Sequence, residues 1–176
     1  MKAARQGDHL RLTFDRFEAR LLQSILDALI TNYQVPPEQL DAKAAEAWYS
    51  RRGCQTAGMS PEDTRDWLAQ LHGYKSANLA LLRRCRAQLA DPHHDPIELV
   101  VPVDQAPALM TALNDHRLLL AARHDIGEAE MEMPLRQALK KLSPVQQTAL
   151  VEIDFLAWII QEILHLIAPE AAYWMY

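Results

Sequence analysis

The longest apolar helical segment of the chain lies between Ser143 and Pro169 and limits the possible folds most. Ser143-Pro144 places a serine cap before a proline at the first helical position, and Pro169 cannot continue the helix. We therefore expect a helix from Pro144 to Ile167 that is apolar nearly all round. Such a helix is typical of the centre of a bundle, where other helices surround it.

Ionisable side chains within this segment argue against a membrane span. Its most apolar stretch, residues 150–168, carries five polar or charged residues: Glu152, Asp154, Gln161, Glu162 and His165. Each ionised group at a bilayer centre costs about 2.5 to 3.5 kcal/mol. We expect a buried core helix and no contact with a membrane.

The rest of the chain also shows mostly helical periodicity. Caps, prolines and apolar spacing predict helices at about 16–33, 40–51, 61–89, 105–124 and, less regular, 128–141. Alternation at 9–14 and a β-prone run at 97–101 predict two short strands. The expected fold is mainly all-α: an orthogonal or up-down bundle of about five to six helices, with a possible small two-stranded β ribbon.

A length of 176 residues, 49% of them hydrophobic, suits one core. We expect a single helical domain over 1–176, with a flexible N-terminus at 1–8 and an aromatic C-terminal tail at 169–176. The N-terminal residues lack the apolar region of a secretory signal, and Cys54 and Cys85 form no CxxC pair. Both observations predict a cytoplasmic protein.

Charge and motifs exclude several functional classes. The formal net charge of −5 makes nucleic acid an unlikely partner, because phosphate binding normally needs a basic face. The sequence contains no HExxH, no GxSxG and no glycine-rich phosphate loop. We therefore expect no enzyme activity, no catalytic residues and no cofactor.

One pair has the spacing of a metal site. Glu162 and His165 form a Glu-x-x-His pair, which occurs in duplicate in carboxylate-bridged di-iron bundles. This chain has no second copy. We therefore interpret His165 as a core histidine at the helix end, and Glu162 and His165 as only a minor metal-site hypothesis.

Polar residues within apolar helices form a second candidate site. They are Asn114, Asp115, Arg117, Arg123 and Asp154. If Arg117 or Arg123 met Asp154 across the core, the pair would fix helix register or line a small polar pocket. We favour a structural network.

Two exposed clusters are candidate contact surfaces. Arg83, Arg84 and Arg86 could bind an anion or nucleic acid, but cations near a helix C-terminus are already favoured by the helix dipole. The tail carries Tyr173, Trp174, Met175 and Tyr176. We expect this tail either to fold back on its own domain or to dock on a partner or a second copy.

Residues 112–123 and 153–162, together with the region 71–82 around Lys75, resemble an uncharacterised bacterial helical family. That family is common in actinobacteria and is often encoded near the Clp-protease adaptor, and some members are labelled transcriptional regulators. The resemblance implies a helical cytosolic protein without implying a mechanism. This sequence departs from the family pattern in its 91–96 loop and its aromatic tail.

The leading functional hypothesis is a non-enzymatic regulatory or adaptor-like module that binds another protein, through a groove between helices or through the tail. Self-association is the related possibility. One alternative is a transcriptional regulator that contacts DNA through Arg83–Arg86 or Lys140-Lys141. Another is a metal-binding or enzymatic helical bundle built on Asp154, Glu162 and His165.

Overall fold

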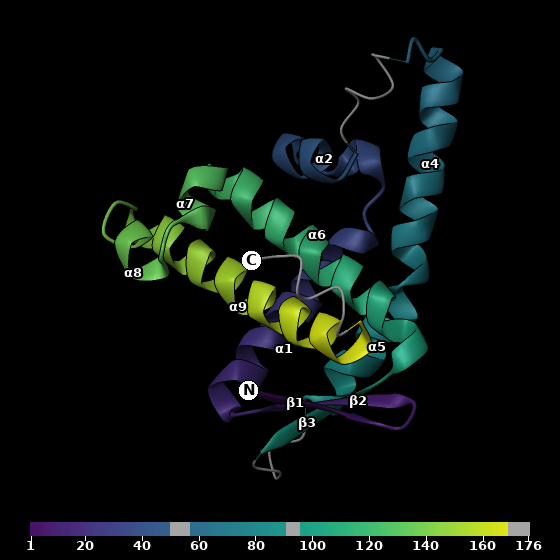
Figure 1. The fold of residues 1–176 in the computed structure, drawn as a ribbon. Helices are drawn as coiled ribbons and strands as arrows, with labels where there is room; N and C mark the ends of the chain where they lie inside the picture. The colour runs from purple at the N-terminus through teal and green to yellow at the C-terminus, as the bar shows by residue number, and fades with distance from the viewer. Residues whose placement is uncertain (50–56, 91–95, 169–176) are drawn as a thin grey trace.

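The computed structural model of the chain describes residues 1–49, 57–90 and 96–168. Within them, helices dominate, and a small antiparallel sheet lies at one end of the molecule (Figure 1). The predicted mainly helical fold class is confirmed. Among the described residues, no helix is long and apolar enough to cross a membrane.

The sheet has three strands in the order β1-β2-β3, where the sequence predicts two. The predicted ribbon is present as β2 (His9–Phe14) paired antiparallel with β3 (Ile97–Pro102). Its register sets buried residues opposite one another, with Leu12 facing Leu99 and Leu10 facing Val101. The period-two alternation of both segments therefore places one face of the ribbon in the core.

The additional strand is β1 (Lys2–Gln6), which forms a hairpin with β2. Gln6 pairs with His9, so Gly7 and Asp8 form a two-residue turn, and Gly7 has a φ of 60°. A positive φ at the first turn position suits glycine and matches the twist of paired strands. The structure thus differs from the flexible N-terminus expected at residues 1–8.

The first two helices follow their sequence signals. Helix α1 (Arg16–Tyr33) begins at the predicted cap: the Asp15 carboxylate accepts a hydrogen bond from the Glu18 N–H, and the Glu18 carboxylate accepts one from the Asp15 N–H. The 3₁₀ turn η1 (Pro37–Gln39) follows, and then α2 (Ala42–Tyr49). Asp41 caps α2 by accepting from the Ala44 N–H at 2.9 Å.

The long helix expected over 61–89 is divided into α4 (Pro61–Ala77) and α5 (Leu79–Gln88). The break lies at Asn78, not at Gly73, which stays helical. Helix α5 buries Leu81, Leu82 and Cys85 and packs on α1, whereas α4 has no buried residue. The two halves of the predicted helix therefore have different packing.

The chain then passes through η2 (Val103–Gln105) into α6 (Ala106–His124). Asp104 lies inside η2, so it does not cap α6 as expected. The helix expected over 128–141 consists of two short pieces, α7 (Glu128–Glu132) and α8 (Leu135–Ala138). Pro134 separates them because it cannot donate a helical hydrogen bond.

Helix α9 (Pro144–Ile167) has its predicted bounds, and Ser143 and Gln146 form its capping box. Its packing differs from the expectation. One side packs on α6 in the most extensive helix–helix contact of the molecule, while Val151, Asp154 and Trp158 on the other side are exposed. Among the described residues α9 is therefore an outer helix of the fold and not its centre.

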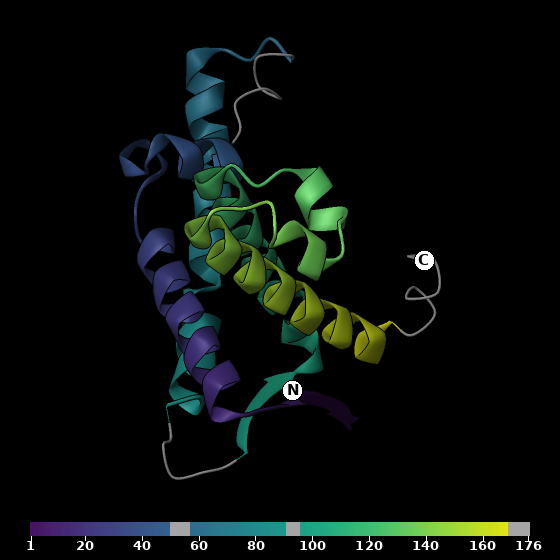
Figure 2. The same cartoon turned by 90° about the vertical axis from the view of Figure 1, so that its left-hand side faces the viewer.

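Helix α4 projects from the body of the molecule. In two views at right angles, its N-terminal end extends beyond the other helices, and its C-terminal end joins α5 close to α1 and α6 (Figures 1 and 2). The sheet lies at the opposite end. The last turns of α4 contact the C-terminal ends of α1 and α2 and the middle of α6.

Candidate functional site

Asp115, a buried residue on α6, accepts hydrogen bonds from side chains of three other helices. Asp115 is only 7% exposed. Its Oδ2 atom accepts hydrogen bonds from the Tyr33 hydroxyl and from the Lys75 ammonium, each at 2.5 Å. Its backbone carbonyl accepts a third from the Trp48 indole N–H at 2.7 Å. One residue therefore connects α1, α2, α4 and α6.

Aromatic rings surround the ammonium that pairs with Asp115. The Lys75 Nζ atom lies 5.4 Å from the Trp48 ring centroid and 5.8 Å from the centroids of Tyr33 and Tyr49. These distances fall within the range of cation–π attraction. Tyr33 and Trp48 also contact each other edge-on, with centroids 5.4 Å apart. We call Tyr33, Trp48, Tyr49, Lys75 and Asp115 the lysine box.

Each member of the lysine box is placed by a helix end or by a buried helix face. Tyr33 is the last residue of α1, and Trp48 and Tyr49 are the last two of α2. Lys75 lies in the last turn of α4, and Asp115 on the buried face of α6. The helix ends meet here because the proline-containing turn after α1 directs α2 back across α6.

The phenols of the lysine box stay protonated in this environment. Burial, and then the neighbouring Asp115 carboxylate, raise the pKa of Tyr33 well above its ordinary value. The same two causes raise the pKa of Tyr49 to about 12. Tyr33 therefore acts as a hydrogen-bond donor to Asp115.

Two further side chains of α4 extend the network outward. The Tyr49 hydroxyl and His72 Nδ1 share a hydrogen bond of 3.3 Å. The Ser76 hydroxyl donates to the Tyr33 backbone carbonyl at 3.3 Å, and it lies 3.4 Å from His72 Nε2. His72, Lys75 and Ser76 together bind the C-terminal end of α4 to α1, α2 and α6.

A cleft of about 570 Å³ lies beside this network, between η1 and α4. The residues that line it are Pro36, Pro37, Glu38, Arg65, Leu68, Ala69 and His72. A smaller hollow of about 120 Å³ shares Pro37 and Leu68 with the cleft and reaches Tyr49. The cleft is mainly apolar, has one acidic and one basic side chain, and borders the lysine box through His72.

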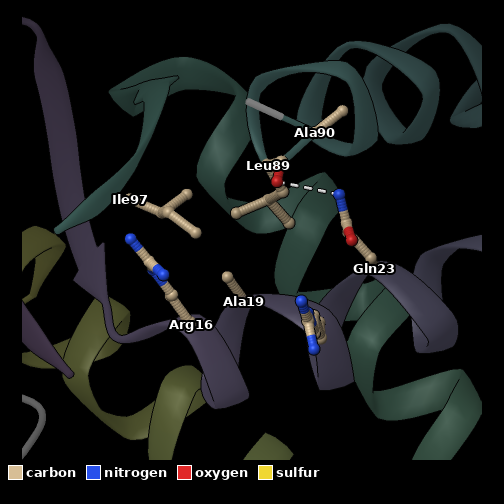
Figure 3. A pocket seen from close by; sticks show the side chains of 7 residues that line it. Arg16, Ala19, Gln23, Leu89, Ala90 and Ile97 are labelled. Atoms are coloured by element: carbon tan, nitrogen blue, oxygen red, sulfur yellow. Dashed lines mark hydrogen bonds between the residues drawn. The ribbon is translucent and has the colours of Figure 1, made fainter. Parts of the chain in front are cut away.

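A second pocket of about 200 Å³ lies between α1 and the end of α5 (Figure 3). Arg16, Arg20 and Gln23 line it from α1, and Gln23 closes one side by donating to the Leu89 carbonyl at 2.8 Å. Leu89 and Ala90 directly precede residues 91–95, which lie outside the described structure. The cleft at α4 is larger and is bounded by described residues, so it is the stronger candidate.

The structure brings only one of the five predicted network residues into the box. At the surface, the Asn114 side-chain carbonyl accepts a hydrogen bond from the Arg117 guanidinium at 3.2 Å. Arg117 is half-buried, and this burial lowers the pKa of its guanidinium below the ordinary value, although the Asp154 carboxylate acts in the opposite direction. Asp154 is exposed on α9. Arg123 is exposed and forms an ion pair with Asp41, so it does not reach Asp154 across the core.

The remaining predicted sites lie elsewhere. Glu162 is half-buried and His165 is exposed, so His165 is not the core histidine expected. Among the described residues, no group of three or more His, Cys, Asp or Glu side chains could hold a metal ion. The possible partner-binding residues Tyr173, Trp174, Met175 and Tyr176 lie outside the described residues.

The arginines of α5 are largely engaged within the chain. Arg86 donates to the Asp27 carboxylate at 3.0 Å, which raises the pKa of the guanidinium, and Arg84 donates to Gln105 at 2.8 Å. Arg83 is exposed. Two of the three arginines therefore have hydrogen-bond partners within the chain.

A protein-family model, described as a domain of unknown function (DUF2017), matches residues 69–167. The chain belongs to this family. The matched region contains Lys75 and Asp115 but not the three aromatic residues of the lysine box, which precede it. No curated protein and no solved structure matches the chain.

Sequence reasoning missed most of the lysine box. Tyr33 and Trp48 show only helical spacing in the sequence, and the one pairing that the sequence predicts joins Arg117 or Arg123 to Asp154, which leaves Asp115 without a named partner. One signal was available: Lys75 lies four residues beyond Leu71 on a face otherwise marked by Leu68 and Leu71. A lysine on the inner face of a helix requires a buried anion.

Proposed function

We propose that this DUF2017 protein is a non-enzymatic, adaptor-like protein that binds a segment of a partner protein in the cleft beside α4. The observation that carries the proposal is that α4 has 17 residues and none of them is buried. Helices of this length normally owe their stability to an apolar face packed on a core. A helix that keeps its apolar side chains half-exposed is a suitable surface for a partner.

The composition of the cleft suits a peptide segment. Leu68, Ala69, Pro36 and Pro37 offer apolar contacts, and Glu38 and Arg65 provide a charge of each sign. Protein interfaces commonly combine apolar contacts at the centre with polar groups at the rim. The expected partner segment therefore has apolar anchors and is flanked by charged residues, as in helix-in-groove recognition.

The state of Lys75 favours binding over catalysis at this end of the molecule. A lysine nucleophile needs a free amine, but Lys75 donates to Asp115 and its side chain is 14% exposed. Asp115 has a side chain 11% exposed and shares one oxygen between two donors. These contacts support a structural role for the box beside a binding cleft.

Site-specific cross-linking tests the proposal. Ala69 is exposed and lines the cleft, so we would replace it with the photo-reactive residue benzoylphenylalanine and irradiate cells of the source organism. We expect a discrete adduct whose partner is identified by mass spectrometry. The purified partner should bind the unmodified chain and lose binding to Ala69→Arg, which fills the cleft with a charged side chain.

The matched control is the same photo-reactive residue at Ala87, which is exposed on α5 and outside the cleft. The experiment is repeated on a chain ended at Ala168, so that a contact through the tail is distinguished from one in the cleft. Identical adducts at Ala69 and Ala87, or no loss of binding in Ala69→Arg, would refute the cleft as the binding site. An adduct of two copies of the chain would instead indicate self-association.

A further inference from the structure

The contacts of α4 with other helices differ between its two ends. Its hydrogen bonds and ion pair with other described elements come from His72, Lys75 and Ser76, all in the last turns. Towards the N-terminal end, its contacts with the main core come from the half-buried Leu68 and Leu71. The helix is thus held at one end and projects at the other (Figure 2).

We propose that the lysine box is a latch: the Lys75 ammonium holds α4 closed against the body, and its withdrawal lets α4 move and opens the cleft. This inference deepens the proposed function and rests on it for its biological meaning. The latch itself is a property of the free chain.

The connection between α4 and α5 provides the hinge. Helix α4 ends at Ala77 and α5 begins at Leu79, and the Asn78 side chain caps neither of them. The Asn78 N–H bonds to the carbonyls of Lys75 and Ser76, which tightens the last turn of α4. Since α5 is fixed by its buried leucines, movement at Asn78 would displace α4 and leave α5 in place.

The chemistry of the box suits a reversible contact. An ammonium that leaves the box regains its hydration, and Asp115 keeps the hydrogen bond from Tyr33. An apolar anchor in the same place would expose its surface to water on opening. The Lys75–Asp115 ion pair therefore specifies the closed position of α4 and can still be broken reversibly.

The width of the cleft depends on the Lys75–Asp115 contact, because one wall of the cleft is on α4 and the other wall precedes α2. Arg65, Leu68, Ala69 and His72 are on α4, while Pro36 and Pro37 precede the box residues of α2. His72 both lines the cleft and contacts Tyr49 of the box. Release of Lys75 therefore widens the cleft, and a segment bound in the cleft is linked to the state of the latch.

Hydrogen exchange of the full-length chain tests the latch. In Lys75→Met, which removes the charge and shortens the unbranched side chain by one heavy atom, we expect the amides of α4 to exchange about tenfold faster than in the unaltered chain. The amides of α6 and α9 should also exchange faster, because Lys75→Met leaves the Asp115 carboxylate without its counter-charge, but by a smaller factor than the amides of α4, which lose their own contact with the body. Lys75→Arg keeps a cation and should exchange close to the unaltered chain.

Leu68→Ala serves as the comparison variant, since it weakens the packing of α4 but keeps the Lys75–Asp115 ion pair; its α4 amides should exchange less rapidly than those of Lys75→Met. Uniform acceleration in all helices of Lys75→Met, or no change in α4, would overturn the latch. If Lys75→Met does not fold, native-state hydrogen exchange of the unaltered chain provides the test. The latch predicts that α4 opens at a lower free energy than α5 and α6. Exchange of the α4 amides only through global unfolding would contradict the proposal. No partner enters this test, so its outcome is separate from that of the cross-linking.

Discussion

Lys75 and Asp115 are 40 positions apart in the sequence, yet the Lys75 ammonium donates a hydrogen bond to the Asp115 carboxylate at 2.5 Å. The rings of three aromatic residues lie around this ammonium. Their ion pair joins α4 to α6, and Tyr33 joins α1 to the same carboxylate oxygen. Helix α2 is added through the bond from Trp48 to the Asp115 backbone. Asp115 and its ion-pair partner therefore lie where four helices meet.

Asp115→Asn should destabilise the chain by about 3 kcal/mol, because it leaves the Lys75 ammonium in the box without a counter-charge. The geometry of the side chain is nearly unchanged, so lost packing contributes little. Urea unfolding followed by circular dichroism measures the loss as a lower midpoint.

The double variant Lys75→Met with Asp115→Leu serves as the control for that prediction. Replacing both charges by apolar groups removes the unpaired charge and should recover a large part of the stability lost in Asp115→Asn. A double variant less stable than both single variants would show that the box depends on charge in a way that apolar packing cannot replace.

In Tyr49→Phe, the free energy of unfolding should depend less on pH in the alkaline range than it does in the unaltered chain. In the folded chain the pKa of Tyr49 is raised from 10.0 to about 12, mainly by burial and then by Asp115. The folded chain holds this proton more tightly than the unfolded chain, so the stabilising contribution is complete below pH 10 and is lost as pH rises through about 12. Urea unfolding at a series of alkaline pH values gives both profiles.

Tyr33 is present in both chains of that comparison, and burial and Asp115, the larger causes of its raised pKa, act on it in both, so its contribution to the difference is small. Phenylalanine cannot ionise but fills the same space beside Lys75. If the two stability profiles ran parallel from pH 10 to about 12, the raised pKa of Tyr49 would not influence folding.

Local sequence signals predicted the elements whose caps and alternation are self-contained. The Asp15–Glu18 capping box and the Ser143-Pro144 start gave the bounds of α1 and α9, and alternating Leu10 and Leu12 predicted β2. Strand β1 was missed because it is a polar edge strand without alternation. Gly7-Asp8, a two-residue turn next to β2, was the signal that could have revealed it.

Tertiary contacts decided what local signals could not. The hydrophobic spacing on both sides of Asn78 is continuous, so only the different packing of α4 and α5 reveals the break. The sequence marked Asp115 as a polar residue in an apolar helix, but its partners come from positions 33, 48 and 75. Nothing local in the sequence connects these positions.

The Asp41 carboxyl group should titrate below its ordinary pKa of 3.8, and removal of Arg123 should only partly reverse this shift. The hydrogen bond from the Ala44 N–H is the largest cause of the lowered pKa, and the hydrogen bond from Arg123 comes second. In Arg123→Ala the helix cap remains, so the pKa should rise and yet stay below 3.8. Carbon-13 NMR of the side-chain carboxyl measures both values.

The sign of the stability effect follows from the lowered pKa. The contribution of Asp41 is complete above pH 3.8 and is lost as pH falls through the lower folded-state value, because the unfolded chain takes up the proton first. Arg123 lies at the surface of α6, where an ion pair is screened by water and salt. A return of the Asp41 pKa to its ordinary value in Arg123→Ala would mean that the ion pair, and not the cap of α2, holds the carboxylate in its charged form.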